Sequence, residues 1–88
     1  MTWRIEFTRT AEEQIVRLDR QSQSRILGYL RERVLPSGNP RQFGKALHGD
    51  KQGLWRYRAG NYRIICDIRD ERSTVLVLAV AHRKEVYR

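Results

Sequence analysis

The feature that most restricts the fold is the second half of the chain, where strand-like runs are separated by tight-turn signals. In residues 54–59, Trp55, Tyr57 and Ala59 alternate with Leu54, Arg56 and Arg58, which is typical of a β-strand with one buried face. Gly60 and Asn61 follow directly, and both residue types tolerate the positive φ angles of a hairpin turn. Residues 62–69 predict a second strand, and the almost wholly apolar run 74–81 predicts a third, covered on both faces. These runs predict a meander of three antiparallel strands.

The first half of the chain predicts one strand followed by two helices. Apolar and polar residues alternate over 3–7, as in a half-buried strand. Thr10 and Glu13 have the spacing of a capping box, which predicts that a helix begins there. A second helix is expected around the apolar stripe at 26–34, and Pro36 is expected to end it.

Together these elements predict an α+β fold: an N-terminal strand, a helical hairpin, then a three-strand antiparallel meander, forming one sheet packed on the helices. A chain of 88 residues has room for one hydrophobic core, so residues 1–88 are expected to form a single domain. The sequence shows no signal-peptide core and no apolar run that could span a bilayer. The single cysteine, Cys66, cannot form an internal disulfide, which fits a reducing compartment. A cytoplasmic protein without membrane contact is expected.

Charge is the outlying property of the composition. The 18 Lys and Arg residues against 10 Asp and Glu leave a net charge of +8. Only three of these cations are lysines, although lysine alone would provide solubility. Arginine is favoured where phosphates are bound by two parallel hydrogen bonds or where bases are stacked. The composition therefore predicts a polyanionic partner such as RNA. The simpler alternative is a coding bias that increases the number of arginines.

Strand alternation gathers several arginines on one surface. If the aromatic side chains of 54–59 pack inward, Arg56 and Arg58 must point to the opposite face of the sheet. The same argument sends Arg63 outward, within cross-strand reach of the other two. Arg83 follows the last strand directly and can reach this surface. Such a cluster could hold a phosphate and stabilise the extra negative charge of a phosphorane-like transition state.

Other side chains leave alternatives open. The arginine surface could instead be a solvated sheet face whose charge is balanced by Asp67 and Glu85. Tyr87 lies beside a basic run and could stack on a base, or it could pack on the first helix. His48 and His82 are too isolated to predict a metal site. No phosphate-binding glycine loop, nucleophile elbow or paired-carboxylate motif is present, so no metal or cofactor is expected. Two possibilities remain: metal-free acid–base catalysis on RNA, or no catalysis.

Three segments resemble the RelE/ParE superfamily of bacterial toxins, most closely its RelE members: KALHG at 45–49, GLWRYRAGNYRIICDI at 53–68 and VAHRKEVY at 80–87. The paired motifs G-(D/N)-Y-R and H-R-x-x-V-Y are specific at this spacing, whereas either alone is weak. The resemblance implies a RelE/ParE-like fold and the toxin half of a type II toxin–antitoxin pair. It implies three partners: an acidic RelB-like antitoxin in a higher-order hetero-oligomer, the ribosome and mRNA.

The resemblance also implies a reaction. RelE-type toxins enter the ribosomal A site and cleave mRNA without metal, through attack of a ribose 2′-hydroxyl on the adjacent phosphate. Carried onto this chain, Arg63 and Arg83 match the arginines that stabilise the transition state, and Arg56 matches a lysine near the leaving oxygen. Tyr87 matches the tyrosine that stacks on the substrate base. Arg58 would bind the RNA backbone.

Two departures from the family pattern leave the general base unassigned. Leu54 stands where the best-known members have a second lysine, and Arg56 stays protonated at any working pH. The groups that could act as the general base instead are basic or phenolic: Lys51, Lys84, His82 and Tyr87. The first three of these are also expected to bind substrate.

Two other functions compete with mRNA cleavage. The first is that of a ParE-like toxin, which inhibits DNA gyrase by binding and has no nuclease activity. ParE-type chains usually lack the terminal tyrosine, so Tyr87 favours the RelE interpretation. The second is that of a non-toxic RNA-binding module of the ribosome or its assembly factors, which explains the charge but gives no role to the paired motifs.

Overall fold

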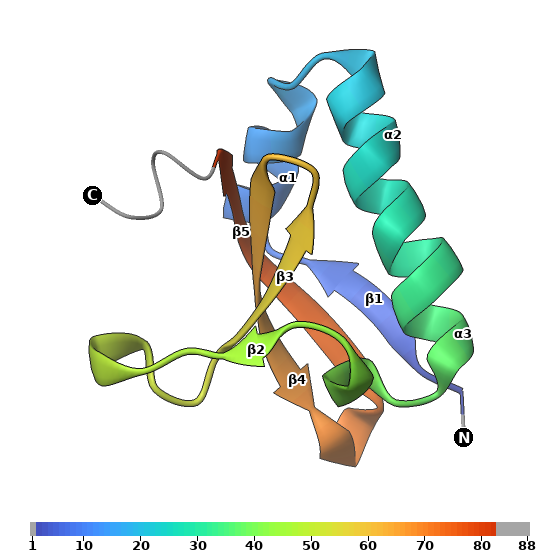
Figure 1. Cartoon of the computed structure of the whole chain (residues 1–88), viewed down its shortest axis with the longest axis vertical. Helices are drawn as coiled ribbons and strands as arrows, with labels where there is room; N and C mark the ends of the chain where they lie inside the picture. The colour runs from blue at the N-terminus through green and yellow to red at the C-terminus, as the bar shows by residue number, and fades with distance from the viewer. Residues whose placement is uncertain (1, 83–88) are drawn as a thin grey trace.

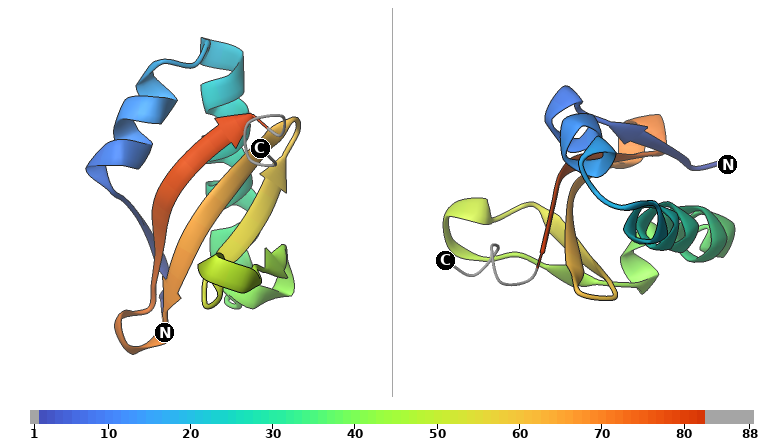
Figure 2. Two further views of the ribbon diagram at one scale, coloured as in Figure 1. Left: turned by 90° about the vertical axis from the view of Figure 1, so that its left-hand side faces the viewer. Right: turned by 90° about the horizontal axis from the view of Figure 1, so that it is seen from above.

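The computed structural model describes residues 2–82 and contains one five-stranded sheet with helices packed against one face (Figures 1 and 2). The strands are β1 (Arg4–Phe7), β2 (Lys45–Ala46), β3 (Trp55–Ala59), β4 (Tyr62–Arg69) and β5 (Thr74–His82). Their order across the sheet is β1-β5-β4-β3-β2. Strand β1 runs parallel to β5, whereas every other neighbouring pair is antiparallel. The predicted α+β fold and the β3–β4–β5 meander are confirmed, but the sheet is mixed and has five strands.

Strand β2 is the element that the sequence did not predict. It consists of only Lys45 and Ala46, and both side chains are exposed. Two residues show no alternation, so no periodic pattern marks such a strand. Its register is set by β3, because Lys45 lies opposite Arg56 and Ala46 opposite Trp55.

The helices pack on one face of the sheet (Figure 2). The helical elements are α1 (Arg9–Val16), α2 (Arg20–Tyr29), the π-helical turn η1 (Leu30–Val34) and α3 (Leu35–Ser37). The short 3-10 turns are η2 (Pro40–Gln42), η3 (Gly49–Lys51) and η4 (Asp70–Arg72).

The first helix begins earlier than the predicted capping box at Thr10. The N-cap is Thr8, whose hydroxyl oxygen accepts a hydrogen bond from the backbone N–H of Ala11 at 3.1 Å. The same hydroxyl donates to the carbonyl oxygen of Leu78 in β5 at 3.1 Å. Thr8 therefore caps α1 and ties it to the sheet, an advantage that the local spacing of Thr10 and Glu13 did not reveal.

The prediction that Pro36 ends the second helix is wrong. The helical path continues from α2 through η1 into α3, which contains Pro36, and ends at Gly38. In η1, the N–H of Leu35 donates to the carbonyl oxygen of Leu30, five residues earlier. This wider turn directly precedes the proline and accommodates its missing N–H, which would break a regular α-helix.

The hydrophobic core lies between the helices and one face of the sheet. Its members from α1, α2 and η1 are Ala11, Ile15, Ile26, Leu30 and Val34, and its main members from the sheet are Tyr57, Ile64, Cys66, Val75, Val77 and Val80. The hydroxyl of Tyr57 is buried and donates to the carbonyl oxygen of Pro40 at 2.6 Å. The predicted inward orientation of the aromatic side chains of β3 is therefore confirmed, since Trp55 also packs against this core.

Burial of Cys66 leads to a prediction about alkaline stability. Burial raises the pKa of its thiol above the ordinary value of 9.0, so the unfolded chain releases this proton at lower pH than the folded chain does. Unfolding should therefore become easier as the pH rises above about 9, because ionisation favours the unfolded state. Measured by urea unfolding, the free energy of unfolding should fall less steeply with pH in Cys66→Ala than in the parent protein. Parallel curves would contradict this linkage.

Candidate functional site

The face of the sheet turned away from the helices carries a row of cations. Alternation along β3 places Arg56 and Arg58 on this face, because Tyr57 between them enters the core. Arg63 of β4 lies directly opposite Arg58, and Lys45 of β2 lies directly opposite Arg56. We call this surface, defined by Lys45, Arg56, Arg58 and Arg63, the arginine face. Its three arginines were predicted to share one surface, and the register brings them together.

Arg63 lies on the predicted outward face but is buried there, which the sequence did not predict. Only 5% of its surface is accessible, whereas Arg58 is exposed and Arg56 is half-buried. Arg63 lies in β4, the middle strand of the sheet, between Arg58 on one side and Ala81 on the other. A guanidinium stays charged when buried, and an anion that reaches it there is attracted more strongly than in bulk water.

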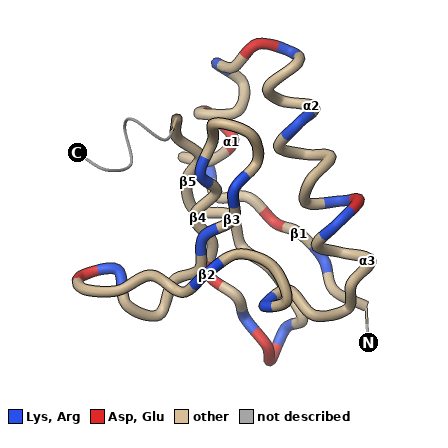
Figure 3. The backbone as a smooth tube through the Cα atoms, in the orientation of Figure 1, with Lys and Arg blue, Asp and Glu red and all other residues tan. Residues whose placement is uncertain are grey.

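Acidic side chains lie mainly outside this surface. The basic stretches of β2, β3 and β4 lie side by side, while acidic positions are found largely on the helices and loops around them (Figure 3). Asp67, which the sequence offered as a counter-charge, accepts a hydrogen bond from Nε of Arg69 at 3.1 Å. Asp67 shares the alternation of Arg63 and so lies on the same side of the sheet, further along β4, where this contact is with an arginine of its own strand. The other suggested counter-charge, Glu85, lies outside the described residues.

The structure does not bring His82 and Lys51 together with the arginines. His82 pairs with Tyr62, one position beyond the Arg63–Ala81 pair, so alternation turns it to the helix side of the sheet. Its ring lies edge-to-face against that of Tyr62, with ring centroids 5.6 Å apart. Lys51 is exposed in η3, within the loop that extends away from the sheet between β2 and β3 (Figure 1).

Three of the predicted site residues lie outside the described residues. They are Arg83, Lys84 and Tyr87, and their expected roles in transition-state stabilisation, substrate binding and base stacking stay predictions.

Lys45 is the site residue that the sequence reasoning missed as a functional group. It was noted only within the 45–49 motif, although its pairing with Arg56 places a primary amine on the arginine face. Leu54 lies one residue before β3 and shares the alternation of Arg56, so its half-buried side chain belongs to the same side. A lysine at either position could transfer a proton, which the arginines cannot do.

Within residues 2–82, no group of three or more His, Cys, Asp or Glu side chains is arranged to hold a metal ion. The helices of that same part of the chain are too short or too polar to cross a membrane.

Comparison with known proteins places these features in a family. A family model described as the ParE toxin of type II toxin–antitoxin systems matches residues 5–87. Toxin RelG of Mycobacterium tuberculosis is 34% identical over 90 residues, covering 100% of this chain and 99% of that toxin. Toxin RelE of the same organism is 29% identical over 86 residues, covering 98% and 87%. The crystal structure of the M. tuberculosis RelBE2 toxin–antitoxin complex superposes with a TM-score of 0.84 at 28% identity, covering 94% of this chain and 100% of that one.

Proposed function

The chain belongs to the ParE toxin family of type II toxin–antitoxin systems, and we propose that it is a metal-independent endoribonuclease that cleaves mRNA in the ribosomal A site. This activity would take place in the cytoplasm, where ribosomes translate. The similarity to the toxins RelG and RelE of M. tuberculosis supports the proposal.

The proposed reaction is an internal transesterification. The ribose 2′-hydroxyl loses its proton and its oxygen attacks the adjacent phosphorus, while the bond from phosphorus to the 5′-oxygen of the next nucleotide breaks. The leaving oxygen takes up a proton, so the products are a 2′,3′-cyclic phosphate and a 5′-hydroxyl. Negative charge on the phosphoryl oxygens rises in the transition state, and fixed cations lower the barrier by stabilising that charge.

Arg63 is the observation that carries this proposal. Its guanidinium is desolvated, held in the middle strand of the sheet and adjacent to Arg58. A cation fixed before the reaction does not have to be reorganised when charge develops, so it stabilises the transition state more than a mobile surface cation would. In this proposal Arg63, with Arg83, stabilises the phosphorane-like transition state, and Tyr87 stacks on the base.

The neighbouring arginines have positioning roles. Arg56 would lie near the leaving oxygen, and Arg58, which is exposed, would bind the RNA backbone through two parallel hydrogen bonds. Neither can accept the 2′-hydroxyl proton, because a guanidinium stays protonated. Lys45, opposite Arg56, therefore joins Lys51, Lys84, His82 and Tyr87 as a candidate acid–base group, and among the described residues it is the lysine on the arginine face.

A lysine at position 54 should increase the rate. If proton transfer limits cleavage, Leu54→Lys restores a lysine beside Arg56 and should raise the single-turnover cleavage rate on ribosomes by about 10-fold or more. The matched control is Val16→Lys, which adds the same charge at an exposed position of α1. Equal rates for both variants would show that the charge and position at residue 54 do not limit cleavage.

The activity itself is tested by primer extension on a translated message with purified protein and ribosomes. Cleavage at A-site codons that persists in the presence of a metal chelator is expected. Intact codons, in a reaction where the protein demonstrably binds the ribosome, would exclude the proposal.

Inhibition of DNA gyrase is the second candidate function, because the matching family model is that of ParE. A gyrase supercoiling assay separates the two. Inhibition with stable cleavage complexes and uncut mRNA would favour the ParE-like function.

The protein partner expected under either function is an acidic antitoxin. The RelBE2 structure is a toxin–antitoxin complex, and the net charge of +8 favours an acidic chain. We propose that a RelB-like antitoxin folds partly on binding this protein, covers the arginine face or displaces the C-terminal segment, and forms a higher-order hetero-oligomer with it.

A further inference from the structure

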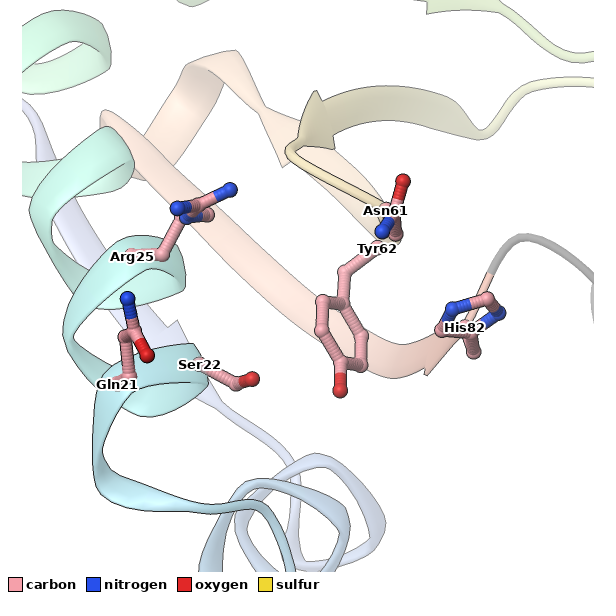
Figure 4. Close-up of a pocket in the computed structure, with 6 residues that line it drawn as sticks. All are labelled: Gln21, Ser22, Arg25, Asn61, Tyr62 and His82. Atoms are coloured by element: carbon pink, nitrogen blue, oxygen red, sulfur yellow. The ribbon is translucent and has the colours of Figure 1, made fainter.

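A polar cavity lies between α2 and the tip of the β3–β4 hairpin (Figure 4). Its volume is about 260 Å³, and its lining consists of Gln21, Ser22 and Arg25 from α2, Asn61 and Tyr62 from the hairpin, and His82 from the end of β5. Figure 4 shows the α2 side chains on one side and Tyr62 between them and His82. Every lining side chain is polar, and none is acidic, so the cavity attracts anions.

Arg25 supplies the charge of this cavity. Its side chain lies against Gly60 in the hairpin turn, where an added Cβ would come within 2.6 Å of its Nη1 atom. Within the part of the chain that the structure describes, Arg25 forms no ion pair. The guanidinium is therefore positioned by contact with the turn and is available to bind a phosphate.

The opposite side of the cavity suits a nucleobase. The rings of Tyr62 and His82 lie edge-to-face at an interplanar angle of 80°, and aromatic surfaces of this kind stack on bases of any sequence. The side-chain amides of Gln21 and Asn61 offer hydrogen-bond donors and acceptors to the base edge. An acidic peptide would use the charge of Arg25 but would gain little from the two rings and the two amides.

Neighbouring hollows connect this cavity with the arginine face. One shares Arg25 and is also lined by Arg33 and by Arg58 of the arginine face. Another shares Tyr62 and His82 and extends the surface to Arg17. A single-stranded polyanion lying over Arg58 could therefore continue around the hairpin tip into the cavity, past Arg33, Arg25 and one acidic side chain, Glu32.

We propose that this cavity binds one nucleotide of single-stranded RNA that flanks the cleaved segment, with its phosphate on Arg25 and its base against Tyr62 and His82. The inference rests on the proposed function for its substrate class. It adds a second subsite on the helix side of the sheet, formed by residues that the arginine face does not include.

The test measures the affinity of the full chain for a short unstructured oligouridylate by fluorescence anisotropy, without ribosomes. Arg25→Gln should weaken binding about 10-fold and lower the slope of log K against log salt by about 0.7, the loss of one phosphate contact. Arg31→Gln is the matched control, because this exposed arginine in η1 lines a different hollow, beside β1. It should change the affinity by less than about 2-fold. His82→Ala should weaken binding through loss of a stacking surface, with an unchanged salt slope.

Several results would overturn the inference. Equal losses of RNA affinity in Arg25→Gln and Arg31→Gln would indicate that the RNA is attracted by the overall positive charge of the protein and not by this cavity. Polyglutamate that competes with the RNA only while Arg25 is present would indicate a peptide site. Thermal unfolding of each variant establishes that the fold is intact.

The outcome is separable from that of the proposed function. Binding that depends on Arg25, in a protein that leaves A-site codons intact, would support the subsite and refute the nuclease. Cleavage by the parent chain, with Arg25→Gln matching Arg31→Gln in both affinity and KM, would refute the subsite alone.

Discussion

Replacing Arg63 with methionine should slow single-turnover cleavage of mRNA on the ribosome by about 10²–10³-fold. Methionine keeps an unbranched stem of similar reach beside Arg58 and Ala81 but has no charge and no hydrogen-bond donor. The effect should appear in the cleavage rate and leave the affinity for the ribosome within about 3-fold, because a buried cation contributes little to a surface contact between large partners. Arg63→Lys should recover part of the rate, since it restores the charge without the planar fork.

The matched control for this prediction is Arg69→Met. Arg69 is in the same strand, is half-buried, and pairs with Asp67 beyond the arginine face. The control removes the same charge from β4, so general loss of basicity or damage to the strand would affect both variants. Similar rates for Arg63→Met and Arg69→Met, in proteins with unchanged thermal unfolding, would remove Arg63 from the reaction.

The orientation of the strands could be predicted from the sequence because alternation is a local property. Once Tyr57 is assigned to the core, Arg56 and Arg58 have no choice of face. The Gly60-Asn61 turn then fixes the hairpin register, which places Arg63 opposite Arg58. Three residues of the arginine face were therefore identified without a structure.

The burial of Arg63 and the orientation of His82 could not be predicted in the same way. The orientation of His82 depends on the exact register between β4 and β5, and the burial of Arg63 depends on what packs around its side chain; the order of strands in the predicted meander fixes neither. The β4–β5 register contains a shift between Ile65 and Cys66, so counting residues along β5 from its start misassigns the face of every residue beyond the shift. Arg63 meets Ala81 only because of this register, and His82 meets Tyr62 for the same reason.

Lys45 shows a second limit of sequence reasoning. Strand β2 exists because β3 provides a partner for it, not because Lys45 and Ala46 favour a strand. The useful signal was Gly44 directly before it, since a glycine at the start of an exposed segment often marks a close approach of two backbones. In the structure, Gly44 lies against β3 at the backbone of Arg56.

Gly44→Ala should therefore be the most destabilising exchange of a loop glycine, with a loss of about 2–4 kcal/mol in the free energy of unfolding. The φ angle of Gly44 is +78°, which L-residues adopt only with strain. An added Cβ would also overlap the carbonyl oxygen of Arg56 and come within 2.8 Å of Nε1 of Trp55. That nitrogen donates to the carbonyl oxygen of Phe43 at 2.7 Å. Residues of β3 cannot shift to make room without breaking this Trp55–Phe43 hydrogen bond. Strand β2 must therefore move away from β3.

The control for Gly44→Ala is Gly49→Ala, where the φ angle is +72° but an added Cβ has no atom within 4 Å. Both variants carry the strain of a left-handed residue, so the difference between them isolates the overlap with β3. Urea unfolding should show a loss of only about 1 kcal/mol for Gly49→Ala. Equal losses would mean that β2 is free to shift, in which case the position of Lys45 opposite Arg56 is not enforced by the backbone. A larger loss for Gly44→Ala, accompanied by slower cleavage under conditions where the variant stays folded, would link this close approach to the arrangement of the arginine face.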